Sequence, residues 1–487
     1  MIEKAISREG IAIATLASLA VFALALLSAA IFNDSDTFWQ IRAGQWMLAH
    51  HAVLYRDPFS LSFAGRPWAP QEWLSEIAMA GAFQAFGWSG VAILTGLAMA
   101  AAVALLGLYL ARRLDPVPCA TVLLLGVGCV MPQLLARPHI LALPLLTAWI
   151  IGLADAVAAH RTPRWFLFPV MALWANLHGG FVFGIALILP FALEAVLADQ
   201  NDRVRTAKNW ALFALGALAV TLLNPNGLNG LAFPFQLMHL KSLSGIGEWQ
   251  SPDFHAFNPV EVAVFAAVFF FVWRGVRLPA VRLVLLLVLL HLCLEHARYS
   301  MLLGIVGAVL VADPLAAALK RAETASISRK HGTIALSMLG IVMLACSIAR
   351  IAYPIRRTDG PMSPISALGV VSPALASEAV FNNYSFGGLL IFDGIKPLVD
   401  SRADLYGDSY LAAYSRAIGG DRAAVDEFFR KYHVVWTILA PGDPLAAALD
   451  RRPGWRRIFS DGFAVVQVGP GFASPVTRPA PPGARNE

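Results

Sequence analysis

Long apolar segments separated by short polar loops occupy the first three quarters of the chain. A helix needs about 20 predominantly apolar residues to cross a hydrocarbon core of roughly 30 Å. Eleven segments approach or reach that length, namely 10–32, 89–111, 116–135, 139–158, 164–177, 180–198, 208–224, 259–274, 279–294, 300–319 and 331–352. The pattern therefore predicts a mainly α, polytopic membrane helical bundle with about eleven transmembrane helices.

The first apolar segment follows Lys4 and Arg8, an arrangement that also begins a secretory signal peptide. Its apolar run is longer than the roughly 7–15 residues of a signal-peptide core, and no small-residue cleavage site precedes the next polar loop. We expect a retained transmembrane helix. A further apolar segment, 72–86, is short and carries Glu72 and Glu76, so we expect it to lie at the outer membrane interface.

Basic residues concentrate in alternate loops of this topology. With the N-terminus in the cytoplasm, the cytoplasmic side holds Lys4, Arg8, Arg112, Arg113, Arg161, Arg164, Arg203, Arg205, Lys208, Arg274, Arg277, Arg282, Lys320, Arg321, Arg329 and Lys330. The opposite side holds far fewer basic residues before the tail. Because cytoplasmic loops of membrane proteins are enriched in Lys and Arg, this asymmetry predicts a cytoplasmic N-terminus and an extracytoplasmic C-terminal region.

The composition changes after residue 352, where Asp, Arg, Gly and Pro increase and long apolar runs end. Short strands are expected near 378–381, 389–392, 397–400, 433–440 and 463–468, and helices at 408–417 and 421–432. The chain therefore divides into a transmembrane domain at 1–352, which includes the first outer loop 33–88, and a small extracytoplasmic α/β domain at 353–470. The Pro-rich end, 471–487, is expected to be disordered.

The overall composition excludes several classes of protein. Hydrophobic residues make up 58% of the 487 residues and charged residues 14%, against about a quarter charged in soluble domains. The net charge of +6 reflects loop residues that orient helices, and no basic run interleaved with aromatic residues indicates a nucleic-acid partner. The four cysteines lie in apolar segments without metal-ligand spacing, which is typical of small buried apolar side chains.

Polar side chains collect at the predicted outer ends of the helices. The candidates are Asp34, Asp36, Asp57 and Glu72 in the first outer loop, and then Arg137, His139, Asn176, His178, Glu248, Glu295, His296 and Arg298. Ionisable groups at membrane depth are costly and are retained mainly where they have a use. A concave, charged outer cavity formed by many helix ends accounts for all of them.

Each candidate also has a structural explanation. Asp36 can cap a helix over 37–50, and a single aspartate is enough for that cap. Asp34 is then left over, and either carboxylate is a candidate for a functional role. Arg137 is either a membrane anchor or an anion ligand. His178 precedes a Gly pair, which is typical of a broken helix end that binds anions, but also of helix packing. The acidic, histidine and arginine side chains at 295–298 form either a phosphate site or a local ion pair.

The stretch from Asp34 to about Gly87 resembles the first outer loop of the GT-C superfamily of membrane glycosyltransferases. That pattern is an acidic residue or pair after the first helix, an aromatic residue, an amphipathic helix and then a proline-containing segment. Here it corresponds to 34–39, 56–59 and 66–74. Protein O-mannosyltransferases and aminoarabinose transferases belong to this superfamily, and the whole chain looks most like bacterial multi-pass proteins placed near it.

The resemblance implies a bacterial inner-membrane enzyme that moves a sugar from a polyprenyl-phosphate carrier to an extracytoplasmic acceptor. It implies that a first-loop aspartate acts as general base on the acceptor hydroxyl. Alignment of Trp39-Gln40-Ile41 places that role on Asp34, and a looser alignment places it on Asp36. The leaving phosphate needs a cation, and Arg137 and Arg298 are the outer candidates. Some relatives bind a divalent metal, and no ligand spacing here decides whether this chain does.

Two other functions stay open. A transporter or flippase for a lipid-linked glycan predicts polar groups along both halves of a path, whereas the cytoplasmic half is nearly all apolar or basic. A non-catalytic membrane assembly protein predicts that the C-terminal domain matters and the first-loop aspartates do not. The tail lacks the Trp-Trp-Asp signature of oligosaccharyltransferases, and its polar run 399–408 suits either glycan contacts or internal salt bridges.

Overall fold

The computed structural model describes residues 7–245, 247–319, 329–470 and 472. The predictions for Lys4, Lys320, Arg321 and the Pro-rich tail beyond residue 472 lie outside the described residues. Contacts divide the chain into two units. The first comprises the described residues of Met1–Ser28, Ser89–Gln236 and Ser244–Pro354, and the second those of Ala29–Trp88, Leu237–Leu243 and Ile355–Glu487.

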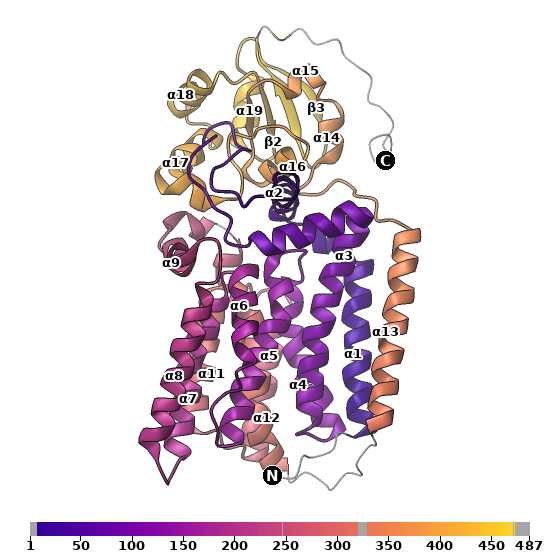
Figure 1. The fold of residues 1–487 in the computed structure, drawn as a ribbon. Coiled ribbons are helices and arrows are strands. Elements are labelled where there is room, and N and C mark those ends of the chain that lie inside the picture. The colour runs from indigo at the N-terminus through magenta and orange to yellow at the C-terminus, as the bar shows by residue number, and fades with distance from the viewer. Residues whose placement is uncertain (1–6, 246, 320–328, 471, 473–487) are drawn as a thin grey trace. The chain divides into compact units, whose positions relative to one another are not determined.

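The first unit is helical. Its helices are α1 (Arg8–Leu27), the second part of α3 (Trp73–Ala111), α4 (Pro116–Val130), α5 (Pro138–Ala158), α6 (Leu167–Leu177), α7 (Phe181–Ala198), α8 (Arg203–Thr221), most of α9 (Gly227–Met238), α10 (Pro259–Arg274), α11 (Ala280–Glu295), α12 (Ser300–Leu319) and α13 (Arg329–Ala352). Short 3-10 turns η2 (Met131–Gln133), η4 (Gly247–Trp249) and η5 (Ala297–Tyr299) join some of them. Helix α12 packs on α4, α5 packs on α6 and α7, and α7 packs on α8 (Figure 1).

The prediction of a mainly helical, multi-pass membrane protein is confirmed. Six helices of the described residues are long and apolar enough to cross a membrane, in the segments Arg8–Leu27, Trp73–Ala111, Pro116–Gln133, Pro138–Ala158, Phe181–Ala198 and Ala297–Leu319. A helix also occupies each of the other predicted segments. Eleven membrane crossings and their orientation stay predictions.

Helix α3 contains a break that coincides with the boundary between the units. Phe86 and Gly87 leave the helical conformation, and Gly87 has φ of 57° and ψ of −146°. A side chain would be strained at this positive φ, so glycine is required there. The first part of α3 is therefore a separate helical segment, as the apolar segment 72–86 predicts.

The second unit combines the first loop with the tail. The loop supplies η1 (Ala29–Phe32), α2 (Asp36–His50) and the start of α3, and a separate short segment supplies the start of η3 (Lys241–Gly245). The tail supplies α14 (Ile365–Gly369), α15 (Pro373–Ala376), β1 (Val380–Asn382), η6 (Tyr384–Phe386), α16 (Gly387–Phe392), α17 (Ala403–Ile418), α18 (Arg422–Tyr432), β2 (Trp436–Leu439), α19 (Pro444–Asp450), β3 (Arg456–Ser460) and β4 (Val465–Val468). The strand order is β1-β2-β4-β3, with β1 and β2 parallel and the other pairs antiparallel.

The sheet differs from the predicted strands at three places. The segment 389–392 lies in helix α16, and 397–400 is an irregular connection. A short, fully apolar run such as 389–392 has no periodicity that separates strand from buried helix. Strand β3 was not predicted, because its exposed Arg456 and Arg457 hide an edge strand in a polar segment.

One hydrophobic core serves both the first loop and the tail within the second unit. Phe38 of α2 is buried with Val380, Trp436 and Val466 of the sheet. The hydropathy pattern places 33–88 with the transmembrane domain, whereas contacts group these residues with the tail. Long-range packing of this kind leaves no local trace in hydropathy, so sequence patterns cannot reveal it.

Candidate functional site

Glu248 lies between two arginines of the first unit. Arg137 Nη1 lies 2.9 Å from Glu248 Oε2, and Arg298 Nη1 lies 3.5 Å from Glu248 Oε1. Arg137 precedes α5, Glu248 lies in η4 and Arg298 lies in η5. The structure thus brings together three of the predicted site residues from distant positions in the sequence.

The surroundings of this cluster position its second arginine. The Arg298 guanidinium carbon lies 4.2 Å from the centre of the Trp249 ring, in cation–π geometry. His296 Nδ1 lies 2.7 Å from the Trp249 carbonyl oxygen, and its ring meets the Trp249 ring edge-on. His296 therefore holds the backbone of η4, the turn that carries Glu248 and Trp249.

The cluster carries two guanidinium groups for one carboxylate. Burial alone would raise the pKa of Glu248, but Arg137 and Arg298 lower that pKa to about 2. Glu248 is therefore ionised at neutral pH, and the two arginines leave a net positive charge. An added anionic group would be attracted to this position.

Two predicted histidines lie beside each other. The rings of His139 and His178 have centroids 6.2 Å apart and meet edge-on. His139 Nε2 lies 2.8 Å from the Gln133 carbonyl oxygen, and His178 Nδ1 accepts the Gly180 backbone N–H at 3.0 Å. The Gly pair after His178 thus forms a tight turn between α6 and α7, closed by the histidine itself.

Two other candidates have different surroundings. Asn176 Nδ2 donates to the carbonyl oxygens of Ala172 at 2.8 Å and Leu223 at 2.9 Å, so it joins α6 to the end of α8. Glu295 is exposed and pairs with exposed His291 one helical turn earlier, at 3.7 Å. The structure gives Asn176 a structural contact, and the ion pair of Glu295 is with His291 rather than with Arg298.

The hydrogen bonds of the first-loop aspartates differ from the predicted helix cap. Helix α2 begins at Asp36, and Asp34 Oδ1 accepts the Asp36 backbone N–H at 2.9 Å. Asp36 Oδ1 accepts the indole N–H of Trp39 at 3.0 Å, and the same N–H lies 3.1 Å from Ser401 Oγ. The prediction that Asp36 caps a helix over 37–50 is wrong, because Asp34 satisfies the backbone at the start of α2.

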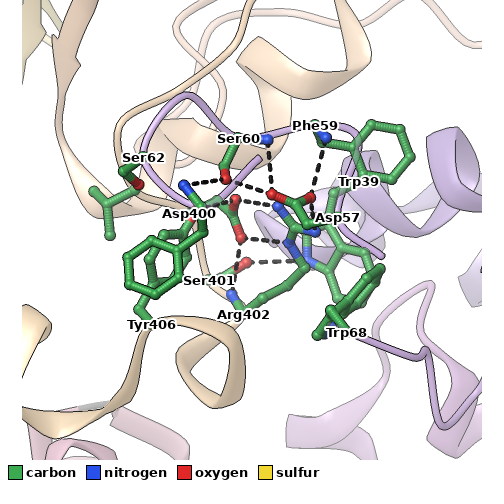
Figure 2. Close-up of polar contacts among 12 residues, drawn as sticks. Trp39, Asp57, Phe59, Ser60, Ser62, Trp68, Asp400, Ser401, Arg402 and Tyr406 are labelled. Carbon is green, nitrogen blue, oxygen red and sulfur yellow. Dashed lines mark hydrogen bonds and ion pairs between the residues drawn. The ribbon is translucent and has the colours of Figure 1, made fainter. Parts of the chain in front are cut away.

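Asp57 is part of a buried ion-pair network that Figure 2 shows. Arg402 Nη1 donates to Asp57 Oδ1 at 2.8 Å, while its Nε and Nη2 bind both oxygens of Asp400 at 2.8 and 2.6 Å. Tyr406 donates its hydroxyl to Asp400 at 2.6 Å. The predicted polar run at 399–408 thus forms internal salt bridges, one of the two alternatives left open above.

The electrostatics of Asp57 follow from this network. Burial alone would raise the pKa of Asp57, but the Arg402 charge and hydrogen bonds from Ser60 and Phe59 hold that pKa below its usual value. The guanidinium also lies over the Trp68 ring, 4.6 Å from its centre. Asp57 is therefore held in its charged form by the fold itself.

Glu72 is half-buried and lies in a second polar group of the same unit. Gln40 Nε2 donates to Glu72 Oε2 at 3.2 Å. Glu76, one turn further along α3, is 0% exposed, and neither carboxylate oxygen has a hydrogen-bond partner among the described residues. Among the described residues, no group of three or more His, Cys, Asp or Glu side chains is arranged to hold a metal ion.

A charged network at the opposite ends of the first unit's helices was missed by sequence reasoning. Arg113 lies 2.6 Å from Asp155 and 2.9 Å from Asp313, and Arg282 lies 2.9 Å from Glu194. The expectation that this half is nearly all apolar or basic is therefore wrong. Single acidic residues inside long apolar segments were the available signal, and each lies near a helix end where hydropathy averages hide it.

Comparison with known proteins finds similarity to solved structures but none to family models or curated proteins. No protein-family model matches the chain, and no curated protein matches it. Among solved structures, the chain is similar to ArnT from Cupriavidus metallidurans, whose crystal structure contains undecaprenyl phosphate. The two share 12% sequence identity, with a TM-score of 0.50 over 94% of this chain and 97% of ArnT. The chain therefore has the fold of ArnT, a GT-C aminoarabinose transferase.

Proposed function

We propose that this protein is a bacterial inner-membrane glycosyltransferase of the GT-C type, which transfers a sugar from a polyprenyl-phosphate carrier to an acceptor outside the cytoplasm. The observation that carries the proposal is the ArnT fold, which extends over 94% of the chain. The acidic pair directly after the first helix supports it, because the resemblance to GT-C enzymes implies a first-loop carboxylate as the general base.

The first-loop pair supplies the base. In the reaction, the acceptor hydroxyl oxygen forms a bond to the anomeric carbon of the sugar, and the bond from that carbon to the carrier phosphate breaks. The hydroxyl proton passes to a carboxylate within hydrogen-bond reach. Asp34 is buried and accepts a backbone N–H at the start of α2, whereas Asp36 is half-buried and accepts an indole N–H. One of the two takes the proton.

The arginine cluster holds the leaving group. The carrier leaves as a polyprenyl phosphate, and the charge that develops on it needs fixed cations. Arg137 and Arg298 both contact Glu248, so two guanidinium groups lie together at this position, and guanidinium groups bind phosphate oxygens well. His139 and His178 lie beside each other in the same unit. Their imidazole rings supply further polar groups to such a ligand.

The test uses Asp34→Asn and Asp36→Asn, singly and together, in a strain that lacks the native gene. Mass spectrometry of extracted lipids should show a carrier-linked sugar that accumulates without the protein and disappears with the wild type. The double variant should accumulate it as the deletion strain does, and the single variants identify the base. Asp426→Asn is the matched control, because Asp426 forms an exposed ion pair with Arg452.

The amount of each variant in the membrane is measured by immunoblot. A double variant present at the wild-type level that restores the wild-type lipid profile would overturn the proposal. That outcome would favour a non-catalytic assembly protein, for which both first-loop aspartates are dispensable.

A further inference from the structure

We propose that a pocket in the first unit, formed where α3 ends and α5 turns into α6, binds the phosphate of an anionic phospholipid from the cytoplasmic leaflet. The pocket has a volume of about 200 Å³ and is lined mainly by Arg112, Arg161, Arg164, Asp155 and Phe166. This site is separate from the Arg137 cluster at the other helix ends and does not depend on the proposed function.

Backbone hydrogen bonds hold the connection that carries the two arginines. His160 adopts a left-handed conformation with φ of 48°, and the Arg161 backbone N–H donates to the Ala156 carbonyl oxygen at 3.0 Å. The Leu167 N–H donates to the Arg164 carbonyl oxygen at 3.1 Å. The segment between α5 and α6 is therefore held by its own backbone hydrogen bonds, so the positions of both arginines are defined.

Helices α5 and α6 pack closely against each other at the pocket. A methyl group at Gly152 would lie 2.8 Å from the Leu167 side chain, so the two helices touch there. Both Gly152 and Leu167 line the pocket. The pocket lining thus combines an apolar contact between α5 and α6 with guanidinium groups.

The charge balance of the pocket favours an anion. Its one acidic side chain, Asp155, is already bound to Arg113 at 2.6 Å, and Arg113 also binds Asp313. Within the described part of the chain, no ion pair or hydrogen bond occupies the guanidinium of Arg161 or Arg164. A phosphate group matches these free donors, because guanidinium groups bind phosphate oxygens in a bidentate manner.

Exposed aromatic side chains indicate that the phosphate belongs to a lipid. Trp165 is 76% exposed and Phe166, which lines the pocket, is 43% exposed. Aromatic side chains of this kind favour the membrane–water interface, and anionic lipids of the cytoplasmic leaflet attract Arg at that depth. Loop arginines alone follow from the orientation of the helices, but a cavity between them with an aromatic edge does not.

The test measures lipid bound to the purified full-length protein in detergent by native mass spectrometry, with added short-chain phosphatidylglycerol or phosphatidylcholine. The wild type should retain phosphatidylglycerol and not phosphatidylcholine. Arg161→Gln with Arg164→Gln should weaken that binding at least about tenfold, since the loss of even one charge-assisted hydrogen bond weakens binding about tenfold. If the double variant expresses poorly, Arg164→Gln alone serves as the test.

The matched control is Arg203→Gln with Arg205→Gln, which removes the same charge from exposed residues on the same predicted side, at the start of α8. It should bind phosphatidylglycerol as the wild type does. Equal loss of phosphatidylglycerol binding in both double variants would overturn the assignment to the pocket. It would show that the lipid binds through diffuse surface charge. Inorganic phosphate at millimolar concentration should not displace the lipid, and full displacement would overturn the assignment to a lipid.

Discussion

The Arg402 guanidinium donates to the Asp57 carboxylate at 2.8 Å, although 345 positions separate the two residues in sequence. Both side chains are buried, with 1% and 0% of their surface exposed. This contact joins the first loop to the tail inside the second unit, which also contains Asp34 and Asp36. The integrity of the first loop therefore depends on the tail.

Replacement of Arg402 by Gln should destabilise the second unit strongly. It leaves the carboxylates of Asp57 and Asp400 buried without their cation, and loss of one partner from a buried ion pair costs about 3–5 kcal/mol. Thermal unfolding in detergent and limited proteolysis of the tail measure the effect. Arg457→Gln is the control, because its pair with Asp450 is exposed and contributes about 0–1 kcal/mol. Equal melting temperatures for the two variants would contradict this prediction.

Gly388→Ala should disturb the segment that carries the acidic pair. A methyl group at Gly388 would lie 2.0 Å from the Ser35 carbonyl oxygen, between Asp34 and Asp36. Backbone must move to admit it, with a cost of roughly 1–3 kcal/mol. We expect a lower melting temperature together with reduced sugar transfer. Gly369→Ala has open space at the same position and should behave as the wild type in both assays.

Acid should weaken the first unit through Glu248. Its pKa falls from 4.5 to about 2 in the fold, so the stabilisation it provides is complete above about pH 4.5 and is lost as the pH falls toward 2. The melting temperature of Glu248→Gln should therefore be lower than that of the wild type at pH 7, and the difference should shrink toward pH 3. A constant difference across this range would show that the charge of Glu248 is not the cause.

Asn176→Ala should reduce stability rather than catalysis. The substitution removes the donor to the Leu223 carbonyl oxygen, and loss of a buried hydrogen-bond partner costs about 1–3 kcal/mol. Activity per folded molecule should stay near the wild-type value. Asn209→Ala, on the exposed face of α8, is the control and should change stability by no more than about 0.5 kcal/mol. A large loss of activity at normal stability would instead make Asn176 a substrate ligand.

Local sequence patterns identify the residues of the arginine cluster but not their contacts. Each of Arg137, Glu248 and Arg298 can be selected from the sequence, because charged side chains at the ends of apolar segments are unusual there. Their common ion-pair cluster could not be derived, since it depends on how the start of α5, η4 and η5 come together. The cap at the start of α2 is a similar case, because two aspartates two positions apart both satisfy the sequence preference.

Hydropathy and charge along the chain identify a helical membrane protein, the positions of its helices and the polar residues at their ends, because these properties act over a few turns of chain. Three further features emerge from the folded protein alone: the first loop shares a core with the tail, Arg402 binds Asp57, and Arg113 binds Asp155. Those contacts join residues that are distant in sequence, and their formation depends on the packing of whole elements, which no local pattern records.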